Sequence, residues 1–121
     1  MQGSRFKEDE HALQLIDAQQ HTLGRIAVER VDQGLFTGEF IRDPGFSTIE
    51  RLFRDYEEAV NLQALTVVDR LDAQIVSLGL RAVLPEGRQV PLHDVPIWSD
   101  GAITFRSLGQ DQSVLEAHVT A

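Results

Sequence analysis

The feature that most constrains the fold is a long helical pattern in the middle of the 121-residue chain. Apolar side chains recur there at intervals of three or four residues, with a mean of about 3.6, the period of an α-helix. They are Ile49, Phe53, Tyr56, Val60, Ala64, Val67, Leu71, Ile75 and Leu78. Ser47 and Glu50 have the spacing of a capping box at its start, and Gly79 suits a left-handed C-cap at its end. The pattern predicts one helix over residues 47–78, and the low helix propensity of residues 61–66 allows a bend there.

Both flanks of this segment alternate apolar and polar residues with the two-residue period of β-strands. Before it, three short runs are separated by turn signals such as Asp32-Gln33-Gly34. After it, three more runs are separated by Pro85-Glu86-Gly87 and Ser99-Asp100-Gly101. We therefore predict an α+β fold in a β3-α-β3 order, in which an antiparallel sheet of about six strands packs on one long central helix.

The length of the chain is that of one domain. We expect residues 1–10 to be a disordered N-terminus, residues 11–108 to form a single α+β domain, and residues 109–121 to be a C-terminal tail. A second capping-box form, from Ser113 to Glu116, indicates a short helical turn in that tail. No apolar run approaches the roughly 18 residues that a membrane helix needs. The first ten residues also lack the apolar region of a secretory signal.

The charge balance is acidic, with 19 Asp and Glu against 11 Lys and Arg and a formal net charge of −8. Proteins that bind nucleic acids or anionic membranes need basic residues, so we expect neither as a partner. The chain contains no cysteine. Disulfides, cysteinyl zinc sites and cysteine nucleophiles are therefore excluded. A cysteine-free chain without a visible signal favours a cytoplasmic location of the bacterial type.

Candidate catalytic and metal-binding groups are sparse. His93 and Asp94 are adjacent on a predicted strand, so their side chains should point to opposite faces of the sheet. Asp69 and Asp72 are neighbours on the predicted helix and could hold a cation, but two ligands do not form a cage, and we interpret them as part of a solvated face. Phosphate-binding glycine motifs and nucleophile elbows do not occur. We expect no catalytic residue, no metal site and no cofactor.

The predicted helix is apolar on two sides. Leu62, Leu65 and Val76 lie opposite the main stripe, and one sheet can cover only one side of a helix. The C-terminal strands or tail could fold over this second side, or a second copy of the chain could cover it. Trp98 should face outward beside a hairpin turn, as an interface anchor or as a shield for an edge strand. We predict a homodimer or a dimer of dimers, with Leu62, Leu65, Val76 and Trp98 at the interface.

Part of the chain resembles short uncharacterised bacterial α+β proteins. The segments concerned are YEEAVNLQ (residues 56–63), VDRLD (residues 68–72) and IVSLGL (residues 75–80), followed by the turn at residues 85–87. The resemblance covers residues 47–106. It implies a bacterial protein, and it brings no activity, cofactor or catalytic residue with it.

Two functions of different classes are compatible with these observations. The first is a non-catalytic protein-interaction module that associates with itself and binds or caps another protein. The second is a small-ligand-binding protein or small enzyme with a cone or hot-dog-like pocket, in which a helix carboxylate such as Asp69 or Glu57 acts as a base. A closed apolar cavity with a convergent carboxylate would favour the second function. A filled core with an exposed apolar stripe would favour the first.

Overall fold

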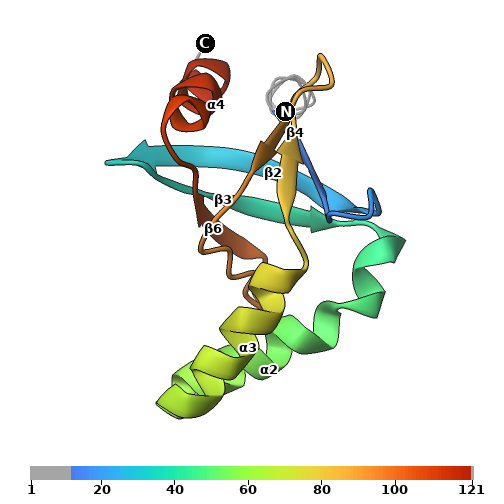
Figure 1. Ribbon diagram of the computed structural model, residues 1–121, viewed down its shortest axis with the longest axis vertical. Helices are drawn as coiled ribbons and strands as arrows, with labels where there is room; N and C mark the ends of the chain where they lie inside the picture. The colour runs from blue at the N-terminus through green and yellow to red at the C-terminus, as the bar shows by residue number, and fades with distance from the viewer. Residues whose placement is uncertain (1–11, 121) are drawn as a thin grey trace.

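The computed structural model of the chain describes residues 12–120. A curled antiparallel sheet lies between helix α4 on one side and the helices α2 and α3 on the other (Figure 1). In chain order the elements are β1 (Leu13–Ile16), β2 (Thr22–Asp32), β3 (Leu35–Arg42), the 3₁₀ helix η1 (Pro44–Thr48), α2 (Glu50–Asn61), α3 (Leu65–Ser77), β4 (Arg81–Val83), β5 (Gln89–Pro91), β6 (Ala102–Arg106) and α4 (Gln110–Thr120).

The predicted α+β class and the six-stranded antiparallel sheet are confirmed. The strands follow the order β5-β4-β1-β2-β3-β6, and every neighbouring pair is antiparallel. The first three strands form the meander that the turn signals predict. Gln33 and Gly34, between β2 and β3, have φ angles of 52° and 83°. Two successive positive φ angles are typical of a tight hairpin turn whose twist matches the strands on either side.

The sheet curls because the chain that leaves one edge returns to the other. The segment after β5 forms bridges to β6, pairing His93 with Arg106 and Ile97 with Ile103. The outer edge of β6 is therefore partly covered, which limits its tendency to pair with other chains. At the opposite edge, Pro91 lies in β5, where a residue without a backbone N–H is tolerated.

The inner face of the curled sheet holds one continuous hydrophobic core. Phe36 of β3 and Phe105 of β6 stack in its centre, with ring centroids 5.0 Å apart. Phe53 of α2 and Ile75 of α3 enter the core from one side, and Leu115 of α4 enters it from the other. The buried members are Leu13, Leu15, Leu23, Ile26, Phe36, Phe40, Phe46, Phe53, Ile75, Leu80, Ala82, Leu84, Val90, Leu92, Val95, Ile97, Ile103, Phe105 and Leu115.

The predicted single helix over residues 47–78 is wrong: α2 and α3 form a helical hairpin that extends away from the sheet (Figure 1). The chain reverses at Gln63, whose φ of 56° no α-helix allows. A straight 32-residue helix would span roughly 48 Å, whereas a domain of this length has a radius of gyration of about 14 Å. By doubling back, α2 and α3 pack on each other, and Ala59 and Leu71 are buried. Val60 of the predicted stripe is left 36% exposed.

The predicted capping box is also wrong, whereas the C-cap is confirmed. Ser47 lies inside η1, and its hydroxyl donates to the carbonyl of Pro44 at 2.9 Å. Pro44 pre-sets the first turn of η1, so α2 begins only at Glu50 and has no side-chain cap at its start. At the other end, Gly79 has a φ of +64° and donates its N–H to the carbonyl of Val76 at 3.1 Å. This left-handed cap turns the chain from α3 toward β4.

The two ends of the chain differ in how far the structure describes them. The predicted disordered segment, residues 1–10, lies outside the described residues. The residues predicted as a C-terminal tail include α4, which begins three residues before Ser113 and is eleven residues long. Leu115 of α4 is fully buried, and Val114 and Val119 pack against the core. Between residues 12 and 120, none of the helices has the length and apolar character needed to span a membrane.

The turn between β1 and β2 is organised by Asp17. Its carboxylate accepts hydrogen bonds from the backbone N–H groups of Gln19 and His21, both at 2.9 Å, and lies 3.0 Å from the ring Nδ1 of His21. Burial by itself raises the pKa of Asp17, but the hydrogen bonds from His21 and Gln19 outweigh it and hold the pKa below its usual value of 3.8. The ionised form of Asp17 therefore stabilises the fold.

We expect the substitution Asp17→Asn to make the free energy of unfolding less dependent on pH in the acidic range. Because the pKa is lowered by folding, the stabilisation is complete above the unfolded pKa of about 3.9 and is lost as the pH falls through the folded pKa. The difference in unfolding free energy between wild type and variant should therefore be largest near neutral pH and shrink below about pH 4. Urea unfolding of both proteins near neutral pH and near pH 3 measures it. An equal difference at both pH values would contradict the assignment.

Candidate functional site

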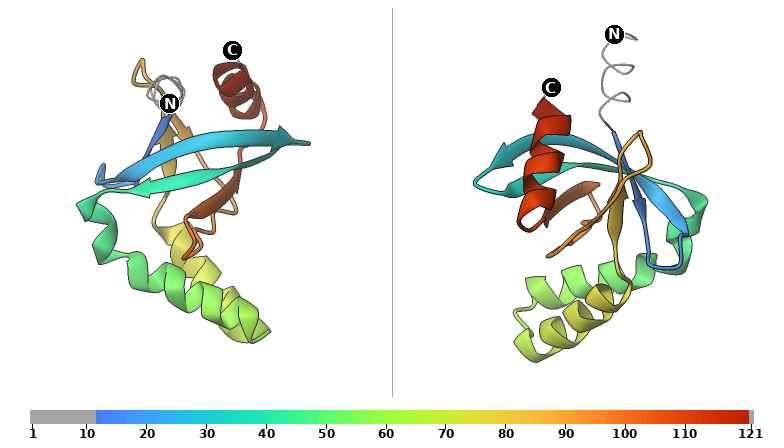
Figure 2. Two further views of the ribbon diagram at one scale, coloured as in Figure 1. Left: turned by 180° about the vertical axis from the view of Figure 1, so that it is seen from behind. Right: turned by 45° about the horizontal axis from the view of Figure 1, so that its top comes forward.

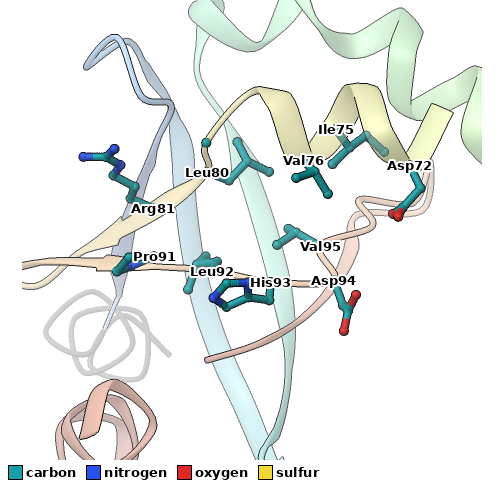
Figure 3. Close-up of a pocket in the computed structure, with 11 residues that line it drawn as sticks. Asp72, Ile75, Val76, Leu80, Arg81, Pro91, Leu92, His93, Asp94 and Val95 are labelled. Atoms are coloured by element: carbon teal, nitrogen blue, oxygen red, sulfur yellow. The ribbon is translucent and has the colours of Figure 1, made fainter. Parts of the chain in front are cut away.

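Two adjoining pockets lie between α3 and the segment that follows β5. The first has a volume of about 260 Å³ and extends from the C-terminal end of α3 across the start of β4 (Figure 3). The second has a volume of about 310 Å³ and continues toward Tyr56 of α2. Both pockets are lined by the same four residues, Asp72, Ile75, Asp94 and Val95. We call this pair of cavities the α3 pockets.

The walls of the α3 pockets come from elements that are distant in the sequence. Asp72, Ile75 and Val76 stand at positions i, i+3 and i+4 of α3 and therefore share one helix face. Opposite them, Asp94 has a φ of 53°, which interrupts the extended backbone after His93. The extended backbone predicted for His93 and Asp94 therefore ends at Asp94.

The interior of the first pocket is apolar and its acidic groups lie at one end. Val76, Leu80, Leu92 and Val95 surround its centre, while Asp72 and Asp94 lie on opposite walls at the end nearest the middle of α3 (Figure 3). Arg81 lines the opposite end, where its guanidinium points away from the centre and donates to the side-chain oxygen of Gln89 at 3.3 Å.

The two carboxylates act on a third group, the phenol of Tyr56, which lines the second pocket. Burial raises the pKa of Tyr56, and the negative charges of Asp72 and Asp94 raise it further. Both acids therefore lie close enough to Tyr56 to influence it. Within the part of the chain that the structure describes, neither acid forms a salt bridge. Their charges are available to a ligand.

The acidic residues that line the α3 pockets together are not the pairs that the sequence suggested. Asp72 lines both α3 pockets, whereas its predicted neighbour Asp69 is exposed and lines neither. Asp94 joins Asp72, and His93 lines only the first pocket. Among residues 12–120, no three His, Asp or Glu side chains are placed to hold a metal ion. Sequence spacing gave no signal for the pairing of Asp72 with Asp94, which are 22 residues apart.

The apolar surface of the helical hairpin is the second candidate site. Leu62, Leu65 and Val76 are 71%, 72% and 69% exposed, and we call these three residues the hairpin surface. Neither the C-terminal strands nor α4 covers them, so that sequence-based alternative is wrong. Leu65 and Val76 are eleven residues apart, which is about three helical turns, so they lie on the same face of α3.

Trp98 lies apart from the hairpin surface. It is half-buried, and its ring lies against Tyr56, with centroids 6.0 Å apart. The next residue, Ser99, donates its N–H and its hydroxyl to the carboxylate of Glu57 at 2.8 and 3.0 Å. These contacts attach the loop before β6 to α2. The interface role of Trp98 stays a prediction.

A smaller pocket of about 130 Å³ lies between β3, η1, α2 and the Trp98 loop. Its floor is aromatic, and the rings of Phe40 and Phe46 lie 4.9 Å apart. Its charged groups are paired with each other: Glu50 accepts from Arg42 and lies 3.5 Å from Arg54. Because these charges are already compensated, this pocket offers less to a charged ligand than the α3 pockets do.

No protein-family model matches the chain, and no curated protein or solved structure is significantly similar to it. The resemblance of residues 47–106 to short bacterial proteins therefore stays a prediction. Function has to be inferred from the two sites themselves, the hairpin surface and the α3 pockets.

Proposed function

We propose that the protein is a non-catalytic interaction module that associates with itself through the hairpin surface. The observation that supports this is the exposure of three large apolar side chains, Leu62, Leu65 and Val76, on a hairpin that extends away from the sheet (Figure 2). Leaving such a side chain in water forfeits about 1.5–3 kcal/mol relative to full burial. Self-association recovers this free energy.

In a two-fold symmetric dimer, the hairpin surface of one copy contacts the same surface of the other. Because Leu65 and Val76 occupy one face of α3, an antiparallel pairing of two α3 helices places Leu65 of each copy near Val76 of the other. Asp69 and Asp72 lie between them on the same face. Since two copies of these acids would repel each other, we expect the contact to be concentrated at the two ends of α3.

The positions of the two carboxylates that the sequence suggested as catalytic bases, Glu57 and Asp69, support a non-catalytic role. Glu57 is engaged by two hydrogen bonds from Ser99, and Asp69 stands in solvent outside the α3 pockets. A general base has to lie within hydrogen-bond reach of a bound substrate. Glu57 lines the pocket of about 130 Å³, but both of its carboxylate oxygens already accept hydrogen bonds from Ser99.

The proposal extends to the setting in which the module works. We propose a homodimer or a dimer of dimers in a bacterial cytoplasm, able to bind or cap another protein, with no cofactor and no nucleic-acid partner. The net charge of −8 and the absence of cysteine support this setting.

Light scattering coupled to size-exclusion chromatography tests self-association directly. The mass of one chain is 13.5 kDa. At tens of micromolar protein, we expect a mass of twice or four times that value, because burial of the hairpin surface favours the assembled state. A mass near that of one chain at this concentration would refute the proposal.

A further inference from the structure

We propose that the α3 pockets bind an aliphatic amine in its ammonium form, with the charge beside Asp72 and Asp94 and the alkyl chain in the first pocket. This inference concerns a different ligand from the proposed self-association, and its site shares Val76 with the hairpin surface. The juxtaposition that carries it is an apolar cavity with two uncompensated carboxylates at one end.

The shape and lining of the first pocket suit an alkyl chain. Val76, Leu80, Leu92 and Val95 surround its centre, and Asp72 and Asp94 lie at one end (Figure 3). The range for small-molecule sites begins at about 300 Å³; the first pocket, of about 260 Å³, lies just below this value and the second, of about 310 Å³, just above it. A chain of several carbons is therefore a better fit than a ligand of drug size.

The charges select a cation over an anion or a neutral molecule. Asp72 and Asp94 come from two separate elements, and neither forms a salt bridge within residues 12–120. An ammonium group can donate a charge-assisted hydrogen bond to each carboxylate. The ring of Tyr56, which lines the second pocket with both acids, adds an aromatic surface that attracts cations.

An organic cation fits this site better than a metal ion does. A bound Ca²⁺ needs six to eight oxygen ligands, and a bound Mg²⁺ needs about six in octahedral geometry. Two carboxylates cannot supply them, and among the described residues no group of three His, Asp or Glu side chains is placed to hold a metal ion. The surrounding apolar side chains gain nothing from contact with a hydrated metal ion, whereas they can bury an alkyl chain.

Titration with n-hexylamine, followed by NMR of the methyl groups of Ile75, Val76 and Val95, tests the inference. At neutral pH hexylamine carries an ammonium group, while 1-hexanol and hexanoate offer the same chain with a neutral and an anionic end. We expect the methyl signals to shift with hexylamine and the affinity to be about tenfold or more lower for hexanol. Hexanoate should not bind. This comparison uses only the wild-type chain and so does not depend on the folding of any variant.

Three Asp→Asn variants locate the charge. Asp72→Asn and Asp94→Asn should each weaken hexylamine binding by about tenfold or more, because each removes one charge-assisted hydrogen bond. Asp69→Asn is the matched control, since Asp69 lies one turn earlier on α3, is exposed and lines neither pocket. Its affinity should match that of wild type. An equal loss in all three variants would overturn the site, because a general effect of negative charge would explain it.

Three further outcomes would overturn the inference. One is the absence of saturable hexylamine binding in the millimolar range, and another is hexanol binding as tightly as hexylamine. The third is tighter binding of a lysine residue capped at both ends, which would assign the site to a protein side chain instead of a free amine. Val76 belongs to both the first pocket and the hairpin surface, so self-association could cover part of the pocket. The hexylamine titration is therefore repeated on Leu65→Glu, the variant designed to disrupt self-association. The affinity of this variant for hexylamine should be equal to that of wild type or higher.

Discussion

Phe53→Ala is expected to lower the free energy of unfolding by about 3–5 kcal/mol. Phe53 is only 2% exposed and lies where α2 meets the core of the curled sheet. Its ring centroid is 5.8 Å from that of Phe46 in η1, so removing the ring leaves a cavity between the helical hairpin and the sheet. Urea unfolding followed by circular dichroism measures the loss.

Two further substitutions make the Phe53 experiment specific. Leu71→Ala should cost about 2–5 kcal/mol, because Leu71 is buried where α3 packs on α2. Leu108→Ala is the control, since Leu108 is exposed outside the hairpin, and it should change stability by less than about 0.5 kcal/mol. If Phe53→Ala were as stable as the Leu108 control, the packing of α2 on the core would be wrong. If the free energy of unfolding of Leu71→Ala were equal to that of wild type, the packing of α3 on α2 would be contradicted.

Leu65→Glu is expected to convert the self-associated protein into a smaller species. Leu65 is exposed in the single chain, so a charge there should leave the fold of the chain intact. In the assembly, the same charge would be buried without a partner, which is strongly unfavourable. Light scattering coupled to size exclusion reports the mass, and circular dichroism confirms that the variant is folded.

Leu108→Glu is the matched control for the oligomeric state. Leu108 is 63% exposed and lies between β6 and α4, away from the hairpin. It should keep the wild-type mass, which separates an effect of the hairpin surface from a general effect of added charge. An unchanged oligomer after Leu65→Glu would instead move the interface to the sheet edge around Trp98.

Local patterns predicted the elements whose causes are local. The two-residue alternation before and after the helical segment predicted the strands, and glycine turns predicted their connections. Gly79 was identified as a C-cap because a left-handed residue is needed there whatever the rest of the chain does. Ser47 shows the limit of such patterns. Its capping-box spacing is real, but Pro44 starts a 3₁₀ turn three residues earlier, and only one of the two local structures can form.

Local sequence patterns did not predict the helical hairpin. The apolar period runs through residues 61–66 without interruption, and weak propensity permits a bend without specifying one. What decides is the packing of α2 on α3, which a straight helix cannot achieve. In the hairpin, Phe53 and Ile75 both reach the core of the sheet, and the free energy gained by this burial exceeds the cost of breaking the helix at Gln63.

Residue patterns along the chain were enough to predict the α+β class, the six-stranded sheet, the turn positions and the apolar residues that a single chain leaves exposed. These follow from periodicity and from the conformations of glycine and proline, which depend on residues a few positions apart. Long-range packing was needed to fold the helix into a hairpin and to effect the meeting of Asp72, Asp94 and Tyr56 at one pocket. That meeting depends on the return of the chain from β5 to β6, a contact between distant segments. Residue spacing along a chain carries no information about such contacts, because they arise from the packing of the whole domain.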